Sequence, residues 1–185
     1  MSRFVVIDTE TTWTDEVMSI GAVVADSSDF SLIDSRYYLI DPHYRIGGMY
    51  SSVLHMRGTP KEYIAARREV TSDMKQWLSA HAVNAIYAYN GSFDKKHLPE
   101  LHDFLWHDIM KIAAYKQYNP RIPESAPCWK TGRLRSDYGV ESIYRMLSGD
   151  RGYFEKHNGW YDALDELKIM EMLAYPLEVY VKARI

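Results

Sequence analysis

Residues 4–12 read Phe-Val-Val-Ile-Asp-Thr-Glu-Thr-Thr, an apolar run that ends in two acids interleaved with threonines. The run Phe4–Ile7 is aromatic and β-branched, as in a buried strand. Side chains alternate along a strand, so Asp8 and Glu10 are expected on one face. Two such carboxylates repel each other unless a cation lies between them, and oxygen ligands favour Mg²⁺ or Mn²⁺. A solvated strand end that enters a Thr-rich turn is the alternative interpretation.

Two later segments also place acids at the edges of secondary structure. Residues 90–94, Asn-Gly-Ser-Phe-Asp, follow a short apolar strand, so Asp94 is expected at the carboxyl end of the sheet. An acid that stabilises the first turn of a helix is the alternative for Asp94. Residues 157–162, His-Asn-Gly-Trp-Tyr-Asp, add a histidine and a fourth carboxylate. Together these side chains suffice for two divalent cations and a general base.

Length and composition indicate one globular domain. The chain has 185 residues, which fits a single domain over residues 1–185 with a substantial core. The lone Cys128 excludes an intramolecular disulfide and fits a reducing compartment, so we expect a cytoplasmic protein. Its apolar runs are strand-sized, so we expect no association with a membrane, and Asp8 interrupts the first run too early for a signal peptide. The net charge of −3 argues against coating of nucleic acid by charge alone, but not against a metal-dependent enzyme.

Apolar periodicity and turn signals predict a mixed α/β fold. Strands are expected at 4–8, 17–26, 32–41, 85–89 and 106–110, and helices from Thr59 and at 72–81, 93–104, 136–147 and 159–175. Short polar connections between the first three strands indicate an antiparallel meander. Thr59, Pro60 and Glu62 form a helix-start signal. The later strand–helix–strand alternation implies a parallel crossover, and residues 118–135 are expected to form a long loop.

The final helix is expected to bury Asp162. At about 100° per residue, Asp162 lies on the apolar arc of this helix, whereas Asp165 turns towards solvent. Glu166 also falls within the arc, and the residues alone give it no role. Tyr161 and Asp165 nevertheless offer an alternative register for this motif, with tyrosine in the place of His157.

Together these motifs resemble the DEDDh family of 3′→5′ exonucleases, part of the ribonuclease H-like superfamily. Residues 4–12 look like the first exonuclease motif and residues 88–94 like the second. His157 with Asp162 looks like the third motif of the histidine subtype, and residues 20–23, Ile-Gly-Ala-Val, look like the strand that follows the first motif. The resemblance spans nearly the whole chain. It implies a ribonuclease H-like fold with a central five-stranded mixed sheet flanked by helices, and a cleft where the three motifs converge.

The resemblance also implies a role for each site residue. One Mg²⁺ or Mn²⁺ ion would be held by Asp8, Glu10 and Asp162, a second by Asp8 and Asp94, and His157 would be the general base. Substrate contacts are expected from Thr11, Trp13, Asn90 and Phe93, with core packing as the alternative for Phe93. The substrate would be DNA or RNA with a free 3′ end, cleaved to nucleoside 5′-monophosphates by a monomer or a homodimer. Trp13 departs from the family, which usually has glycine at this position.

Two other functions are compatible with the sequence. One is a catalytically silent nucleic-acid-binding or interaction module on the same fold, although such a module is expected to have lost one of the five site residues. The other is a different hydrolase, such as a glycosidase with two carboxylates and no metal. Metal-dependent release of mononucleotides separates both from the exonuclease.

Overall fold

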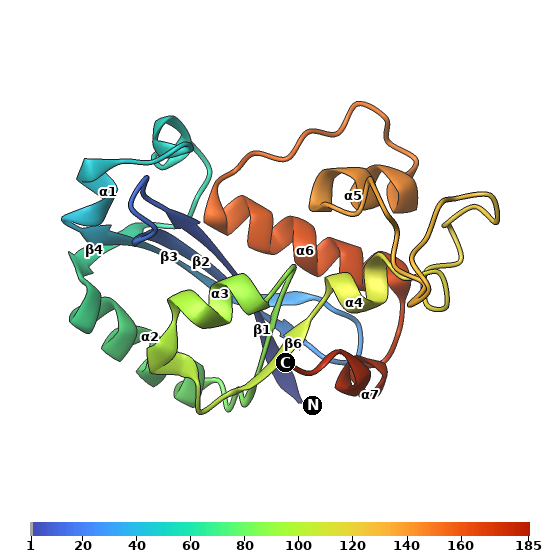
Figure 1. The fold of residues 1–185 in the computed structure, drawn as a ribbon. Coiled ribbons are helices and arrows are strands. Elements are labelled where there is room, and N and C mark those ends of the chain that lie inside the picture. Colours follow the sequence, from blue (N-terminus) through green and yellow to red (C-terminus); the bar gives the residue numbers. More distant parts are fainter. Residues whose placement is uncertain (1) are drawn as a thin grey trace.

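Within residues 2–185, which the computed structural model describes, six strands form one mixed sheet in the order β4-β3-β2-β1-β5-β6 (Figure 1). The strands are β1 (Arg3–Thr11), β2 (Val17–Asp26), β3 (Leu32–Asp41), β4 (Glu62–Ala66), β5 (Ala85–Ala88) and β6 (Leu105–Asp108). The helices are α1 (His43–Ile46), α2 (Arg67–Ala80), α3 (Ser92–His97), α4 (Met110–Ala113), α5 (Val140–Ser148), α6 (Gly159–Leu173) and α7 (Leu177–Tyr180). Short 3₁₀ helices lie at η1 (Ser51–Val53), η2 (Pro99–Leu101) and η3 (Val181–Ala183). The predicted mixed α/β class is confirmed.

The pairing of the strands brings the motif-bearing ends together. β1, β2 and β3 form the predicted antiparallel meander, with Asp8 opposite Gly21. β5 pairs in parallel with β1, and β6 pairs in parallel with β5, which confirms the crossover. Because β1, β5 and β6 run in the same direction, their carboxyl ends meet at one edge of the sheet.

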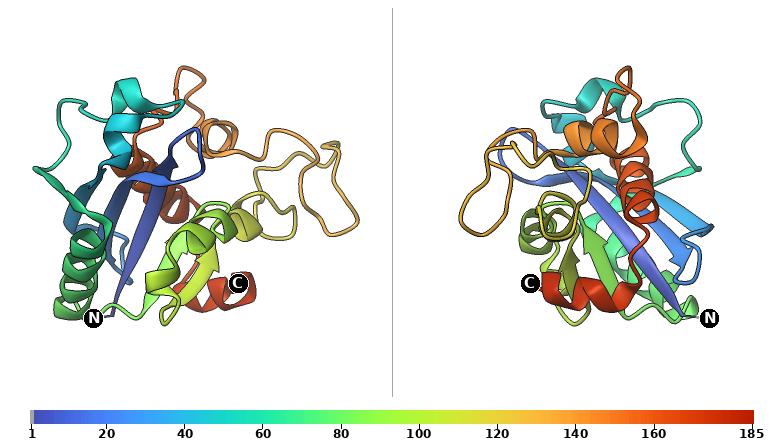
Figure 2. Two further views of the ribbon diagram at one scale, coloured as in Figure 1. Left: turned by 60° about the vertical axis from the view of Figure 1, so that its left-hand side comes forward. Right: turned by 90° about the vertical axis from the view of Figure 1, so that its right-hand side faces the viewer.

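Helices cover both faces of the sheet (Figures 1 and 2). On one face, Met170 of α6 shares a buried cluster with Val6 of β1. On the other face, Met74 of α2 shares a second cluster with Val5. Every residue of β2 is buried, which explains why this strand, apart from Ser19 and Asp26, has no alternation of apolar and polar residues. None of the helices in residues 2–185 combines the length and apolar composition that a membrane span requires.

The start of α6 lies against the sheet directly beside Asp8. A Cβ atom on Gly21 would lie 2.0 Å from the carbonyl oxygen of Gly159, and a Cβ atom on Gly159 would lie 3.0 Å from the backbone nitrogen of Gly21. A side chain on Gly21 would therefore push the helix away from β2. This contact between two glycines brings the first turn of α6, which carries Asp162, to the end of β1.

The helix predicted from Thr59 is wrong. Glu62–Ala66 form the edge strand β4, which pairs in parallel with β3, and the following helix begins at Arg67 instead of residue 72. The Thr-Pro-Lys-Glu signal is local, whereas β3 offers hydrogen-bond partners along the whole segment, which also contains the strand-favouring Tyr63 and Ile64. The sheet therefore has six strands among residues 2–185 instead of the predicted five.

Other boundaries differ by a few residues. The helix predicted at 93–104 ends at His97, because Pro99 keeps Leu98 out of the helical conformation, at φ −122° and ψ 60°. The strand predicted at 106–110 ends at Asp108, and the helix predicted at 136–147 begins at Val140. Residues 118–135 contain no helix or strand, as predicted.

Candidate active site

A cleft of about 490 Å³ opens at the carboxyl edge of β1 and β5. Residues 8–13 form one wall, from the end of β1 and the turn that follows it. Residues 89–94, which follow β5, supply the opposite wall through Tyr89, Asn90, Phe93 and Asp94. Asp162 of α6 completes the lining, so all four carboxylates of the three sequence motifs meet in this cleft.

Asp8 and Glu10 both face the cleft from β1, as the alternation of the strand predicts. Asp8 as a residue is partly exposed, but its Oδ2 atom is buried and meets no hydrogen-bond donor among residues 2–185. Glu10 is buried, and the pairing of β1 with β2 shifts register between Glu10 and Thr11. The irregularity ends the regular ladder at the point where the chain turns into the cleft wall.

Asp94 lies in the first turn of α3 and is tied to β1. Its Oδ1 atom accepts a hydrogen bond of 3.1 Å from the backbone nitrogen of Thr9 and one of 2.8 Å from the Thr9 hydroxyl. The N-cap of α3 is Gly91, and Asp94 is the acidic residue of its first turn, as the alternative interpretation expects. Its hydrogen bonds with Thr9 also connect the second motif to the first.

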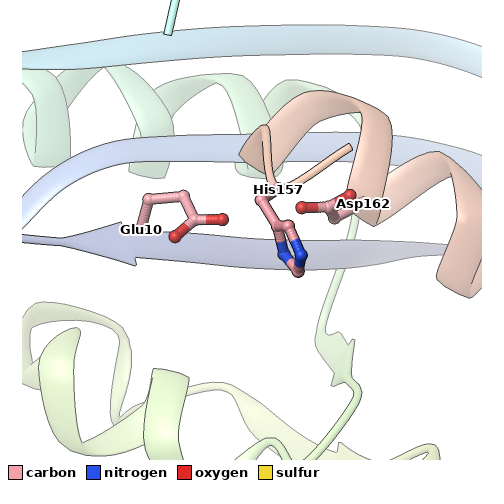
Figure 3. A group of neighbouring side chains, drawn as sticks. All are labelled: Glu10, His157 and Asp162. Atoms are coloured by element: carbon pink, nitrogen blue, oxygen red, sulfur yellow. The ribbon is translucent and has the colours of Figure 1, made fainter. Parts of the chain in front are cut away.

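His157 and Asp162 lie on the two sides of the start of α6. Asn158 is the N-cap residue, and its side chain accepts from the backbone nitrogen of Tyr161. The Asn158 amide also donates to the carbonyl of Val53 at 2.8 Å, which fixes the entry to the helix. Ligand atoms of Glu10, His157 and Asp162 all lie within 4.8 Å of one another, and Figure 3 shows the imidazole of His157 between the other two side chains.

The alternative register of the third motif does not fit this geometry. The hydroxyl of Tyr161 donates to the carbonyl of Arg57 at 2.9 Å, and its ring lies under the ammonium of Lys156 at 3.4 Å. Asp165 accepts from the hydroxyl of Tyr153 at 2.6 Å and, unlike Asp162, does not line the cleft. The structure therefore places Asp162, and not Asp165, beside the other motif carboxylates.

The clustered carboxylates have strongly raised pKa values in the metal-free chain. Burial, and then the neighbouring carboxylates, raise the pKa of Asp8 well above its usual range, that of Glu10 to about 9 and that of Asp162 to about 8. Burial raises the pKa of Asp94 to about 7, although the hydrogen bonds from Thr9 oppose this shift. The cluster is thus destabilised when it is fully ionised without a counter-charge.

A pair of divalent cations fits this donor set. Asp8 Oδ2 and Asp162 Oδ1 are buried carboxylate oxygens that find no hydrogen-bond donor among residues 2–185. Buried polar atoms are normally satisfied, and an unpartnered carboxylate oxygen is costly. Carboxylate oxygens are hard donors, which are the ligands that Mg²⁺ and Mn²⁺ prefer. The residues present therefore fit the metal ions that the sequence predicts.

The residues predicted to contact substrate also line the cleft. Thr11 and Trp13 lie on one side and Asn90 and Phe93 on the other. Trp13 is 71% exposed, so its indole is available to a ligand. Phe93 is 38% exposed and packs on His97 with ring centroids 4.2 Å apart, so it is not a core residue. Their contacts with a substrate stay a prediction.

Three further residues belong to the site and were not predicted. The ring of Tyr50 stacks on the imidazole of His157, and Glu155 lines the cleft with a pKa that burial and Glu141 raise to about 7. The buried Glu166 accepts a hydrogen bond of 2.9 Å from the backbone nitrogen of Tyr89. Glu166 could be recognised as an acid on an apolar arc, whereas no spacing or motif marks Tyr50 or Glu155.

Comparison with known proteins gives the fold. No family model and no curated protein sequence matches the chain. Exonuclease X in complex with 5′ overhanging duplex DNA has a TM-score of 0.60 at 19% identity, covering 99% of both chains. The nuclease domain of 3′hExo, a DEDDh family member bound to rAMP, has a TM-score of 0.64 at 14% identity, covering 92% of this chain and 90% of that one.

A third structure agrees with these two. E. coli Exonuclease I in complex with a dA16 oligonucleotide has a TM-score of 0.63 at 16% identity, and the match covers 98% of this chain but 42% of that one. The chain therefore has the ribonuclease H-like fold of the DEDDh 3′→5′ exonucleases, as its motifs predict.

Proposed function

We propose that this protein is a metal-dependent 3′→5′ exonuclease that releases nucleoside 5′-monophosphates from DNA or RNA. The observation that carries the proposal is the convergence of Asp8, Glu10, Asp94 and Asp162 on one cleft, with His157 beside them. These residues come from three distant segments, and two of the carboxylates have buried oxygens without a donor among the described residues. Three solved structures of similar fold are nucleases with bound DNA or nucleotide, which supports the same assignment.

In this proposal the carboxylates hold two Mg²⁺ or Mn²⁺ ions. Asp8, Glu10 and Asp162 would hold one ion, and Asp8 together with Asp94 would hold the second. When bound, such ions activate water and neutralise the charge that develops on the phosphate. The hydrogen bonds from Thr9 orient the carboxylate of Asp94, so that its Oδ2 atom remains available to the second site.

His157 is the general base of the proposal. Burial lowers the pKa of its imidazole, which favours the neutral form that accepts a proton. The imidazole lies beside Glu10 and Asp162. From there it would accept the proton of the water that attacks the phosphodiester. His157 precedes the N-cap in a left-handed conformation at φ +53°, and Figure 3 shows its imidazole beside Glu10 and Asp162.

The terminal nucleotide occupies the space between the two walls of the cleft. The indole of Trp13 and the ring of Phe93 offer stacking surfaces, and Thr11 and Asn90 offer polar contacts. Stacking on an aromatic side chain contributes about 1–3 kcal/mol per base and accepts any base. We therefore expect little sequence preference and a requirement for a free 3′ end.

The test uses 5′-labelled single-stranded DNA and RNA with Mg²⁺ or Mn²⁺. The expected result is a ladder that shortens one nucleotide at a time, together with nucleoside 5′-monophosphates. EDTA and Asp8→Asn should both stop the reaction, and a circular single strand should not be cut. Activity that survives EDTA would favour another hydrolase, and binding without cleavage at any metal concentration would favour the silent module.

A further inference from the structure

Residues 115–138 form a projection between α4 and α5, which we name the arm (Figure 2). Backbone bridges join Tyr115 to Arg133 and Cys128 to Leu134 within it. At its base the buried side chain of Asn119 donates to the carbonyl of Ala113 at 2.7 Å. The arm is thus a structured element and not only a connection. Because α4 follows the carboxyl end of β6, the arm leaves the sheet at the same edge as the catalytic cleft.

The arm is basic in an acidic protein. It carries five Lys and Arg residues against two Asp and Glu residues, whereas the whole chain has a net charge of −3. Lys116 pairs with Glu124 at 2.8 Å. Lys130, Arg133 and Arg135 have no carboxylate partner among residues 2–185, and the three lie together. Their charges are therefore available to an anionic partner.

These three cations surround a hollow with an exposed tryptophan. The hollow has a volume of about 630 Å³ and is lined by Tyr115, Trp129, Lys130, Thr131, Arg133 and Arg135, none of which is acidic. Trp129 is 50% exposed, and the guanidinium of Arg135 lies 5.0 Å from its ring centroid. A cation against one part of the indole leaves ring surface open for a planar group. Basic and aromatic side chains in this arrangement fit a nucleotide better than a neutral or acidic ligand.

The arm is connected to the catalytic cleft through Tyr89 and Tyr138. Tyr89 lines the cleft, and its hydroxyl donates to the backbone carbonyl of Tyr138 at the end of the arm. The ring of Tyr138 is exposed, and the guanidinium of Arg133 lies 5.2 Å from its centroid. A hydrogen bond therefore joins Tyr89 of the cleft to Tyr138, and a cation–π contact joins Tyr138 to Arg133 of the hollow.

We propose that the arm binds unpaired nucleotides of the substrate strand, on the 5′ side of the terminal nucleotide in the cleft. A base stacks on Trp129, and phosphates pair with Lys130, Arg133 and Arg135. The strand is unpaired at this point, because a side chain can stack fully only on a base that is free of its neighbours in a helix. The inference rests on the proposed exonuclease function and adds a second contact region to it.

Binding is measured first, in the Asp8→Asn background that does not cut. The probes are fluorescent oligo-dT and oligo-U of about 12 nucleotides, within the usual size range of single-strand sites. Trp129→Ala should weaken binding at least about fivefold, the loss expected from removing one stacked base, and Trp129→Phe should restore much of it. Lys130→Ala with Arg135→Ala should reduce the slope of log affinity against log salt concentration by about 1.4, or about 0.7 per phosphate contact.

The matched control removes two charges elsewhere. Arg68 and Lys75 are exposed on α2, on the opposite side of the molecule in Figure 1 from the arm. Arg68→Ala with Lys75→Ala changes the net charge by the same amount. This control should leave both the affinity and the salt slope close to those of the parent. An arm variant that binds as the control does would overturn the proposal, even where the enzyme proves to be an active exonuclease.

Kinetics with the active enzyme give the second test. The quantity is the ratio of kcat/KM on the long oligonucleotide to kcat/KM on a dinucleotide, the shortest substrate with one cleavable bond, which offers the arm the fewest nucleotides. Trp129→Ala and the Lys130/Arg135 double variant should lower this ratio by about fivefold or more. An equal loss on both lengths would contradict an arm that holds the distant nucleotides. Absence of metal-dependent cleavage on either length would refute the proposed function alone, since the binding measurement still decides the role of the arm.

Discussion

The ring of Tyr50 stacks face to face on the imidazole of His157, with ring centroids 4.1 Å apart and an angle of 15° between the planes. Tyr50 precedes the short helix η1, far from His157 in the sequence, and it also lines the cleft of the proposed active site. The stack restricts rotation of the imidazole, which is carried by the loop before α6. Tyr50 is therefore a positioning residue for the proposed general base.

Replacing Tyr50 should lower turnover through the orientation of His157. An aromatic pair contributes about 0.5–1.5 kcal/mol beyond the burial of area, so Tyr50→Ala should reduce kcat by about two- to tenfold. Tyr50→Phe keeps the ring and should keep most of the activity. The measurement is kcat at saturating substrate and metal. Equal activities of the Ala variant and the parent would show that the stack does not orient the base.

The identity of the general base can be tested by a pair of variants. His157→Ala should reduce kcat by about 10²–10⁴-fold, the usual cost of losing such a base. Tyr161→Phe removes only a hydrogen bond to the carbonyl of Arg57 and should be mild. If Tyr161→Phe loses most of its kcat while His157→Ala keeps it, the tyrosine subtype of the motif applies instead.

The pH profile gives a further test of His157. The base must be neutral to accept a proton, so the rate should rise as pH passes upward through its pKa. Burial lowers the pKa of this imidazole, so the inflection should lie below the unperturbed value of about 6.5. His157→Ala should lose this inflection while the remaining slow reaction keeps its dependence on metal. An inflection that persists in the variant would assign the titration to another group.

Asp8→Asn should abolish turnover without unfolding the protein. Asp8 is the ligand proposed to contact both ions. Its pKa is raised mainly by burial and further by the neighbouring carboxylates. Removing its charge relieves repulsion in the metal-free cluster, so the melting temperature in EDTA should be equal to or higher than that of the parent. The exposed Asp103→Asn is the matched control and should change neither quantity. Near-normal activity of Asp8→Asn would remove the two-metal mechanism.

The local parts of the site could be predicted from the sequence. Asp8 and Glu10 end an apolar strand, Asp94 opens a helix after another strand, and Asp162 lies on the buried arc of the last helix. Each placement depends on alternation or helical periodicity within a few residues, which the sequence states directly. The order of the parallel strands then brings the segments to one edge of the sheet.

Contacts that depend on distant partners could not be predicted in the same way. The edge strand β4 forms because β3 offers a ladder to Glu62–Ala66, and the helix-start signal before it is overridden. Tyr50 and Glu155 reach the cleft from loops without a periodic pattern, so the local sequence does not predict which residues they contact. Glu166 was visible as a buried acid, but its partner, the backbone nitrogen of Tyr89, belongs to another element.

Glu166 should be tested with two replacements that separate its hydrogen bond from its charge. Glu166→Ala leaves the buried backbone N–H of Tyr89 without its acceptor and should cost about 1–3 kcal/mol of stability. Glu166→Gln keeps an acceptor oxygen and removes a charge that raises the pKa of Asp8, so it should stabilise the metal-free protein above neutral pH. The measurement is chemical unfolding in EDTA. Equal destabilisation by both variants would contradict this division.

The metal-free protein should lose stability as pH rises through the neutral range. Burial raises the pKa of Asp94 to about 7, of Asp162 to about 8 and of Glu10 to about 9, whereas the unfolded chain titrates near 4. Between these limits the folded state binds more protons than the unfolded state, so the free energy of unfolding decreases with increasing pH. His157 has a lowered pKa and acts in the opposite sense, but only near and below about pH 6.5.

Divalent metal should reverse this trend, because the ions bind the ionised carboxylates and release their protons. In EDTA the melting temperature should be lower at about pH 8 than at about pH 6.5, and Asp8→Asn should show a weaker decline. With Mg²⁺ at a fixed excess, the increase in melting temperature over EDTA should grow with pH, because the Kd falls as the carboxylates ionise. The stabilisation is about 2.7 kcal/mol at the pH where the Mg²⁺ concentration is one hundred times the Kd. Calorimetry of Mg²⁺ binding in buffers of different ionisation enthalpy should show proton release near pH 7. If the increase in melting temperature with Mg²⁺ is independent of pH, the carboxylates are already ionised without metal. Another positive charge would then have to stabilise them in their buried positions.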